Sequence, residues 1–356
     1  MKKQLVKIAE EYSNLFGAPG YEDEVIKRIK EDIDFLDIER DSINNLYAGL
    51  ASQDPSKPTI ALDCHTDEVG FMVENVNKNG NLSFLPLGGW YVGNIPASSV
   101  VVKNTKGEKY IGTVNSKPPH FMTDEERKIL PEMSELTIDL GTVSYDETVG
   151  IYGIEVGNPV VPDVKFIYDD KTGVMRGKAF DNRLGCVAVT TLLNEFKGKK
   201  EKCNLVGIYA SQEEVGLRGA QVAANRVKPD FVIIFEGSPA DDSFKDRESS
   251  HGALKKGVQL RAMDGAMISN PRILKYAKSI AEKKGIKYQV IARKAGSTNG
   301  AKYHTAQKGI PVLILGIPTR YAHTHYSYAA VEDLQSAIEL AKEIIKELDF
   351  KKIKEF

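Results

Sequence analysis

The stretch CNLVGIYASQEEVGLRGA, residues 203–220, combines the two features on which the predicted architecture depends. It joins a continuous apolar run, residues 203–210, to two adjacent carboxylates, Glu213 and Glu214. A continuous apolar run predicts a strand that is buried on both faces, as in a parallel sheet. Two neighbouring negative charges at the end of such a strand gain nothing from packing, so they indicate a functional site.

Three further apolar runs repeat this pattern and alternate with helical segments. The runs are PTIALDCH (58–65), FVIIFE (231–236) and PVLILG (311–316), and the segments with helical periodicity are 186–196, 271–285 and 331–348. Two more amphipathic helices are expected between residues 2 and 35. This alternation predicts an α/β fold: a mostly parallel sheet with helices on both faces.

The hydrophobic pattern of the sequence changes after His65. Short alternating runs are separated by Gly, Pro and Asn, and KNGN (78–81) and NTKGE (104–108) are typical of hairpin turns. Only TDEERKIL (123–130) predicts a helix in this part. We therefore expect a discontinuous catalytic α/β domain, 1–67 with 165–356, and an inserted small barrel-like β domain, 68–164.

The amino-acid composition argues against nucleic acid and membranes as binding partners of the protein. The chain has 356 residues, 42% of them hydrophobic and 27% charged, with a net charge of -1. This balance offers no electrostatic attraction for nucleic acid or for an anionic membrane. The three cysteines form no C-x-x-C pair, no apolar stretch approaches the roughly 20 residues that span a bilayer, and the first residues lack the features of a signal peptide. We expect a cytoplasmic enzyme with no nucleic-acid or membrane partner.

Polar residues with metal-binding side chains follow each predicted strand. Parallel strands present their carboxyl ends at one edge of the sheet, where ligands bind. His65 ends the run 58–65 and Asp67 lies just beyond it, Glu213 and Glu214 follow the run 203–210, and Glu236 ends the run 231–236. His323 and His325 follow the run 311–316, and Asp181 precedes a predicted helix.

These side chains suit a dinuclear metal site. Zinc binds imidazole nitrogen and carboxylate oxygen, and two metal ions require a bridging carboxylate. One of Glu213 and Glu214 would bind metal while the other acts as general base, because consecutive side chains of an extended segment point in opposite directions. Asp67 would orient an imidazole from outside the ligand set. Spacing alone does not choose between His323 and His325.

Five motifs, in this order, resemble those of the M42 family of glutamyl-aminopeptidase-like metallopeptidases, which includes the tetrahedral aminopeptidases. They are HTDEVGF, AFDNRLG, QEEVGLRGA, SPADD and TRYAHTH, and the resemblance covers essentially the whole chain. It implies an α/β domain of the zinc-peptidase (phosphorylase/hydrolase-like) type with an inserted dimerisation domain. It also implies a homo-oligomer, dimers assembling into a tetrahedral dodecamer, and two divalent ions per subunit, zinc first, with cobalt or manganese as alternatives.

The resemblance also implies a role for each matching residue. His65 and Glu236 would bind one metal ion, Glu214 and His323 the other, and Asp181 would bridge both. Glu213 would be the general base and Asp67 a catalytic acid outside the ligand set. The implied activity is metal-dependent hydrolysis of N-terminal residues from peptides, in which Glu213 takes a proton from the water that becomes the metal-bound hydroxide.

Two positions depart from the family pattern. Glu236 stands where family aminopeptidases usually have Asp, and Glu at that position is typical of carboxypeptidases and deacylases of the wider clan. Asn299, in AGSTNGAKYH, replaces a charged Asp, which bears on substrate preference. The alternatives are therefore a deacylase or carboxypeptidase of the same clan, or a non-catalytic homologue that only forms shells.

Overall fold

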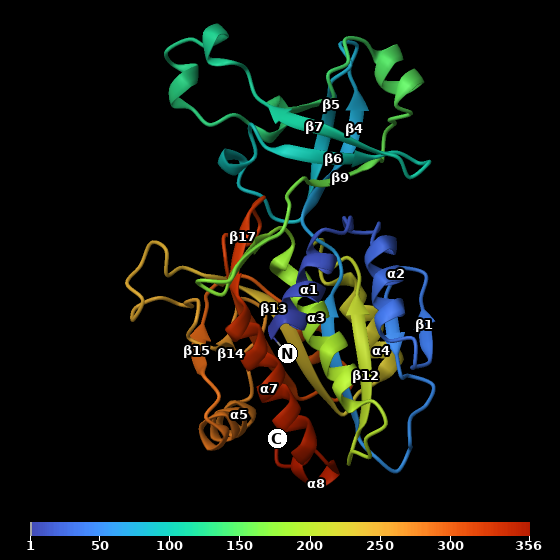
Figure 1. Cartoon of the computed structure of the whole chain (residues 1–356), viewed down its shortest axis with the longest axis vertical. Helices are drawn as coiled ribbons and strands as arrows, with labels where there is room; N and C mark the ends of the chain where they lie inside the picture. Colours follow the sequence, from blue (N-terminus) through green and yellow to red (C-terminus); the bar gives the residue numbers. More distant parts are fainter. Residues whose placement is uncertain (1) are drawn as a thin grey trace.

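The computed structural model describes residues 2–356 (Figure 1). It contains an 11-stranded sheet flanked by helices, and a separate closed barrel of six strands, drawn at the top of the figure. All six barrel strands lie between Gly70 and Pro162, whereas every strand of the large sheet lies outside that segment. Among the described residues, no helix is both long enough and apolar enough to cross a membrane.

Four parallel strands form the centre of the large sheet. They are β12 (Asn204–Ala210), β3 (Thr59–His65), β13 (Phe231–Ala240) and β16 (Val312–Arg320), in that order. Each is the apolar run predicted from the sequence, and almost every residue is buried. The α/β prediction is thus confirmed at the centre of the sheet.

The outer strands pair mostly antiparallel, which differs from the expected mostly parallel sheet. On one side lie β2 (Leu46–Ala48) and β1 (Ile38–Arg40); on the other lie β17 (Ser327–Ala330), β11 (Val174–Gly177) and β10 (Ile167–Asp169). β14 (Val258–Met263) also runs antiparallel to β16 and carries β15 (Tyr288–Ala292) in parallel. Most of these strands have only three or four residues, too few for a period to be recognised in the sequence.

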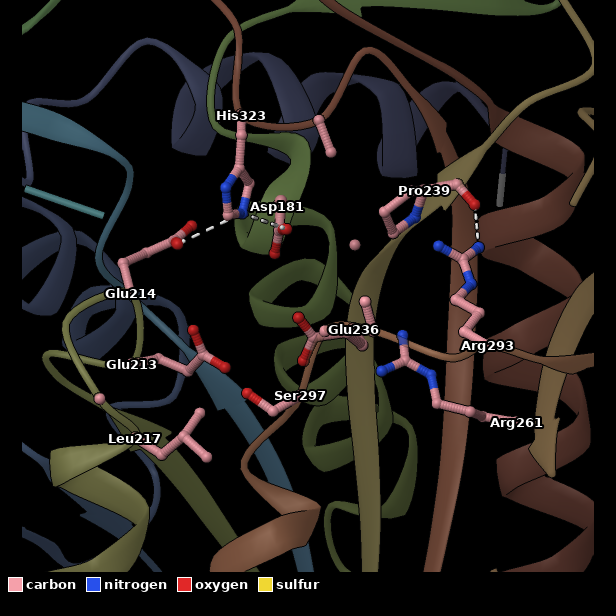
Figure 2. Close-up of a pocket in the computed structure, with 15 residues that line it drawn as sticks. Asp181, Glu213, Glu214, Leu217, Glu236, Pro239, Arg261, Arg293, Ser297 and His323 are labelled. Carbon is pink, nitrogen blue, oxygen red and sulfur yellow. Dashed lines mark hydrogen bonds and ion pairs between the residues drawn. The ribbon is translucent and has the colours of Figure 1, made fainter. Parts of the chain in front are cut away.

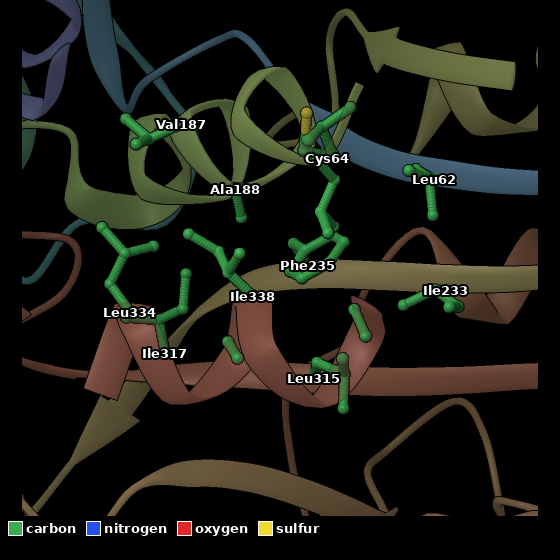
Figure 3. Close-up of a cluster of buried hydrophobic side chains, with 14 of the residues drawn as sticks. Leu62, Cys64, Val187, Ala188, Ile233, Phe235, Leu315, Ile317, Leu334 and Ile338 are labelled. Atoms are coloured by element: carbon green, nitrogen blue, oxygen red, sulfur yellow. The ribbon is translucent and has the colours of Figure 1, made fainter. Parts of the chain in front are cut away.

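Helices cover both faces of the sheet. One face carries α1 (Lys2–Ser13), α2 (Asp23–Asp32), α3 (Phe180–Phe196), α5 (Pro271–Lys284) and α7 (Val331–Glu347), and the other carries α4 (Arg218–Val227) and α6 (Gly300–Tyr303). The short α8 (Phe350–Ile353) follows α7. Figure 3 shows part of the larger core, a single cluster of buried side chains from α3, α7 and the sheet that includes Val187, Leu334, Ile338, Phe235 and Ile317.

The barrel has its own hydrophobic core. Its strands are β4 (Gly70–Val76), β5 (Leu82–Leu87), β6 (Ser99–Lys103), β7 (Lys109–Asn115), β8 (Thr137–Asp139) and β9 (Pro159–Pro162). The two predicted hairpins are confirmed, since β4 pairs with β5 and β6 with β7, both antiparallel. The connections contain short 3-10 turns (Val92–Asn94, Pro119–Phe121, Glu126–Lys128, Met133–Glu135) and a π-helical turn (Glu147–Ile151).

The helix predicted in TDEERKIL is wrong. Only the 3-10 turn Glu126–Lys128 forms there. The apolar side chains Ile129 and Leu130 remain 71% and 53% exposed, so no buried face stabilises a longer helix.

We expect Ile338→Ala to lower the free energy of unfolding by about 2–5 kcal/mol, because it leaves a cavity between α7 and the sheet where Ile338 is fully buried. Guanidinium denaturation measures the effect. Val222→Ala, at an exposed position of α4, is the control and should change the value by less than about 0.5 kcal/mol. Equal losses in the two variants would contradict this account of the core.

Candidate active site

The register of the parallel strands brings the predicted residues to one edge of the sheet. His65 is the last residue of β3 and lies opposite Ala210, the last residue of β12. Ile234 of β13 lies opposite Asp63, so Glu236, two residues further on, is level with His65. β13 does not end at Glu236, as its sequence indicated, but continues to Ala240. Glu236 is therefore held within a strand, which limits its freedom.

Asp181 lies between the two imidazoles. Its Oδ1 is 3.1 Å from Nε2 of His65 and its Oδ2 is 3.6 Å from Nε2 of His323. Figure 2 shows its carboxylate between His323 and Glu236. Asp181 is at the start of α3, and its own dihedral angles are not helical. Each oxygen of one carboxylate thus faces a different imidazole, the arrangement that a bridging ligand requires.

His65 is fully buried and its orientation is defined by Asp67. Its Nδ1 lies 3.1 Å from the backbone oxygen of Asp67 and 3.4 Å from the Asp67 carboxylate. Because a carbonyl oxygen only accepts, Nδ1 carries the proton, and Nε2 faces the cluster. Burial opposes the charged imidazole, but the charge of Glu213 and the hydrogen bond with Asp181 raise the pKa of His65 well above its usual range.

His323 meets Glu214 at the other side of the cluster. Its Nε2 is 3.3 Å from Oε2 of Glu214, and its Nδ1 donates to the backbone oxygen of Gly89 at 2.9 Å. The charge of Glu214 raises the pKa of His323 to about 10, so a cation binding there would displace a proton. Gly89 belongs to the barrel segment, which therefore contributes directly to this edge of the sheet.

Glu213 and Glu236 approach His65 from two directions. Oε2 of Glu213 lies 3.8 Å and Oε1 of Glu236 lies 3.7 Å from Nε2 of His65. Burial raises the pKa of Glu213 well above its usual range, and the charges of Glu236 and Glu214 add to the rise. Burial also raises the pKa of Glu236 to about 7 and that of Glu214 to about 8. Burial opposes the ionised form of Asp181, but hydrogen bonds with His323 and His65 lower its pKa below the ordinary value.

Glu213 and Glu214 do not point in opposite directions, which corrects the expectation from an extended segment. β12 ends at Ala210, and the backbone then turns, with the amide of Leu217 bonded to the carbonyl of Glu213. Both side chains line the same pocket (Figure 2). The Asp67 carboxylate accepts from the backbone N–H groups of both residues, each at 3.0 Å.

The donor set fits cations. Ligand atoms of His65, Glu213 and Glu236 lie within 4.8 Å of one another, and so do those of His65, Asp181 and Glu214. Oε1 of Glu214 and Oε2 of Glu236 are buried and lack a hydrogen-bond partner in the described chain. Within residues 2–356, no Lys or Arg forms an ion pair with any carboxylate of the cluster. Buried carboxylates without cationic partners are costly, and metal ions remove that cost.

His325 lies outside the cluster. It is buried with its ring 5.4 Å from that of Trp90, and neither ring nitrogen has a partner among the described residues. Burial lowers its pKa to about 4. The geometry therefore distinguishes it from His323, a choice that spacing had left open.

Asn299 does not face the pocket. It is fully buried, and its Nδ2 donates to Oδ1 of Asp63 at 2.7 Å, beside the hydroxyl of Tyr303 at the other oxygen. Any influence of Asn299 on substrate preference is therefore indirect.

The sequence reasoning missed two groups at the site. Arg261, on the unrecognised strand β14, lines the pocket together with Arg293 and Ser297 (Figure 2). A charged residue inside the run VQLRAM was the available signal. The second missed group is Gly89, and the only feature of the sequence that pointed to it is the pair of adjacent glycines in LGGW.

Comparison with known proteins places this arrangement in a family. The family model described as M42 glutamyl aminopeptidase matches residues 44–340. The chain belongs to the M42 family. M42 peptidases are metal-dependent, in agreement with the clusters above, and the predicted family and peptidase class are confirmed.

The similarity to individual relatives extends over most of the length of both chains. The glutamyl aminopeptidase of Lactococcus lactis is 30% identical over 318 residues, 89% of this chain and 88% of that protein. The lysyl aminopeptidase of Pyrococcus furiosus is 27% identical over 93% of this chain and 94% of its own. The crystal structure of a TET aminopeptidase from a marine-sediment Thaumarchaeota archaeon has a TM-score of 0.94 at 31% identity, covering 99% of both chains.

We expect Gly89→Ala to weaken binding of one metal ion about tenfold or more. A Cβ at this position would lie 3.2 Å from Nδ1 of His323, so the imidazole must shift. Calorimetric titration of the metal-free M42 enzyme measures this. Gly150→Ala, with no atom near the added Cβ, is the matched control in the barrel. Unchanged affinity in Gly89→Ala would show that the barrel does not support His323.

Proposed function

We propose that the chain is a dinuclear-metal aminopeptidase that removes N-terminal residues from peptides. The observation that carries the proposal is the Asp181 carboxylate, which presents one oxygen to His65 and the other to His323. The donor set of imidazoles and carboxylates suits two divalent ions per subunit, zinc first and cobalt or manganese as alternatives.

The proposed ligands divide into two sets that share Asp181. His65 and Glu236 complete one set, and Glu214 and His323 complete the other. Asp67 stays outside both sets and acts on them through His65 and through the backbone of Glu213 and Glu214. When bound, the ions supply Lewis acidity, which polarises a scissile carbonyl and makes water more acidic.

Glu213 is the proposed general base. Its carboxylate is buried beside His65 but is not needed in either ligand set. The raised pKa of Glu213 suits a group that takes a proton from the attacking water and returns it to the leaving nitrogen. Its backbone is anchored by Asp67, which keeps the carboxylate within reach of the reacting atoms.

The pocket beyond Glu236 suits an acidic side chain of the substrate. Arg261 pairs with Asp264 at 3.1 Å and Ser238 at 2.7 Å, and Arg293 donates to Gln259 and to the carbonyl of Pro239. The Nε atoms of both arginines are buried without a partner in the described chain. Burial and the charge of Arg261 lower the pKa of Arg293 to about 10.

Within residues 2–356, Asp264 is the one carboxylate that forms an ion pair with either arginine, so an N-terminal Glu or Asp of the substrate would supply a second negative charge. The glutamyl aminopeptidase of L. lactis bears a name consistent with this preference, whereas the lysyl aminopeptidase of P. furiosus indicates that relatives differ. The pocket itself therefore has to be tested.

We also propose that the inserted segment, residues 68–164, forms a dimer contact from which a dodecamer assembles. Large apolar side chains are exposed on it, each by 65% or more: Ile111, Phe121, Ile129, Val143, Ile151 and Val156. Apolar side chains that gather into one exposed patch are typical of an interaction surface, so burial of these six in a dimer contact is part of the proposal. Light scattering at several protein concentrations tests the assembly.

Glu213→Gln should lower kcat by at least about 100-fold while two metal ions per subunit remain bound, because the amide cannot take the proton but leaves the ligand sets intact. Metal analysis and peptide hydrolysis measure the two quantities. Glu10→Gln, an exposed position of α1, controls for loss of one carboxylate. Near-normal turnover in Glu213→Gln would refute the assignment of the base.

Aminoacyl-nitroanilides with N-terminal Glu or Asp should give a higher kcat/KM than those with Leu or Lys. Arg293→Gln should lower the value for Glu about 10-fold or more with little effect on Leu, since a hydrogen bond to a charged group contributes about 1.5–3 kcal/mol. Lys294→Gln is the control, because Lys294 is exposed and does not line this pocket. A preference for Lys would contradict the assignment, and equal cleavage of N-acetylated peptides would favour a deacylase instead.

A further inference from the structure

We infer that Glu22 is a positioning residue for the turn that carries Glu213 and Glu214. Glu22 is fully buried just before α2, in the N-terminal segment APGYEDEV, and it touches no member of the metal cluster. The inference rests on the proposed role of Glu213 as general base. It concerns a residue that acts on the reaction only through the backbone next to that base.

The contacts of Glu22 join three separate segments. Its Oε1 accepts from the backbone N–H of Gly20 at 2.8 Å and from that of Gln212, 190 residues later, at 3.2 Å. Its Oε2 accepts from Nδ2 of Asn44 at 3.1 Å. One buried carboxylate therefore fixes the end of the first loop, the 41–45 loop and the residue immediately before the catalytic pair.

Gln212 has an unfavourable conformation that needs such support. Its φ is +51°, in the left-handed region that non-glycine residues rarely adopt. This conformation turns the chain away from the direction of β12 and lets Glu213 and Glu214 enter the same pocket. A strained backbone of this kind persists only where neighbouring groups over-determine it.

Four consecutive backbone N–H groups hold this turn in place, each through a hydrogen bond to a side chain. Ser211 donates to Oδ1 of Asn45 at 2.9 Å, Gln212 to Glu22 at 3.2 Å, and Glu213 and Glu214 each donate to Asp67 at 3.0 Å. Every acceptor is a side chain from the first 67 residues. Asp67 also contacts His65, so its loss would affect metal binding as well; Glu22 has no such second contact with the cluster.

Removing the Glu22 carboxylate should release the Gln212 N–H and let the turn relax. The carboxylate of Glu213 would then spend less time at the position from which it takes the proton. Positioning errors of this kind lower the rate of the chemical step more than they lower affinity. Of the proposed metal ligands, only Glu214 lies on this turn, and its N–H stays bonded to Asp67 in the variant. The other four lie on other segments, so both ions should be retained.

The experiment compares two buried carboxylates of similar surroundings. Asp333 is also fully buried and accepts from two backbone N–H groups, of Lys255 and Gly257, each at 2.7 Å, but it lies outside the pocket. We expect Glu22→Ala to lower kcat about tenfold or more, with KM within about twofold and two metal ions retained. Asp333→Ala should lower Tm by a comparable amount without lowering kcat.

Two further measurements distinguish positioning from a general loss of stability. Glu22→Gln keeps an acceptor oxygen for the Gly20 and Gln212 amides, so it should restore most of kcat. Amide hydrogen exchange at residues 211–214 should accelerate in Glu22→Ala and stay slow in Asp333→Ala. If Glu22→Ala fails to fold, Glu22→Asp takes its place, because its shorter side chain withdraws the carboxylate from Gln212.

Wild-type kcat in folded Glu22→Ala would overturn the inference, as would an equal loss of kcat in Asp333→Ala or unchanged exchange at 211–214. Failure of the general-base assignment would appear separately, as activity retained in Glu213→Gln. The exchange measurement does not depend on which residue is the base, so the two failures are distinguishable.

Discussion

The site depends on the placement of one carboxylate, Asp181, between two imidazoles that come from opposite ends of the sequence. His65 ends the first central strand and His323 follows the last, and they meet only because β3, β13 and β16 are parallel and in register. A buried carboxylate is unfavourable unless something compensates its charge. The fold therefore brings together several carboxylates that have imidazoles beside them but, within residues 2–356, no Lys or Arg as ion-pair partner.

Glu68, close to the cluster, is a buried acid whose charge is compensated by side chains of the protein. Glu68 is three residues after His65 and equally buried, but it is paired with Lys178 at 2.6 Å and with Arg183 at 3.1 Å. Arg183 also donates to the carbonyl oxygens of Tyr12 and Thr66. Glu214 and Glu236, by contrast, each keep a buried oxygen without a partner in the described chain. Glu68 has two cationic side chains as partners, whereas no Lys or Arg of residues 2–356 pairs with the cluster, which is the pattern expected of a site that binds metal ions.

The sequence revealed the central strands and the residues at their ends because both depend on local features. A continuous apolar run followed by a polar ligand can be recognised without knowing its neighbours in space. The short outer strands β1, β2, β10, β11 and β17, Arg261 on β14 and the contact from Gly89 were missed because they depend on pairing across long sequence distances. The direction of Glu213 and Glu214 was predicted wrongly for the same reason: an extended segment was assumed, whereas distant side chains impose a turn.

The backbone around the site carries conformations that local propensity would not select. Gln212, Tyr321 and His323 all have positive φ, although none is glycine. At His323 glycine is excluded because the imidazole is required, so the unfavourable backbone has to be held by other contacts, here the bond from Nδ1 to Gly89 of the barrel. At Gln212 the equivalent support comes from Glu22. Both supports come from segments remote in sequence, the barrel and the N-terminal loop. The geometry of the site is therefore a property of the assembled chain, and neither the strands nor the motifs alone would produce it.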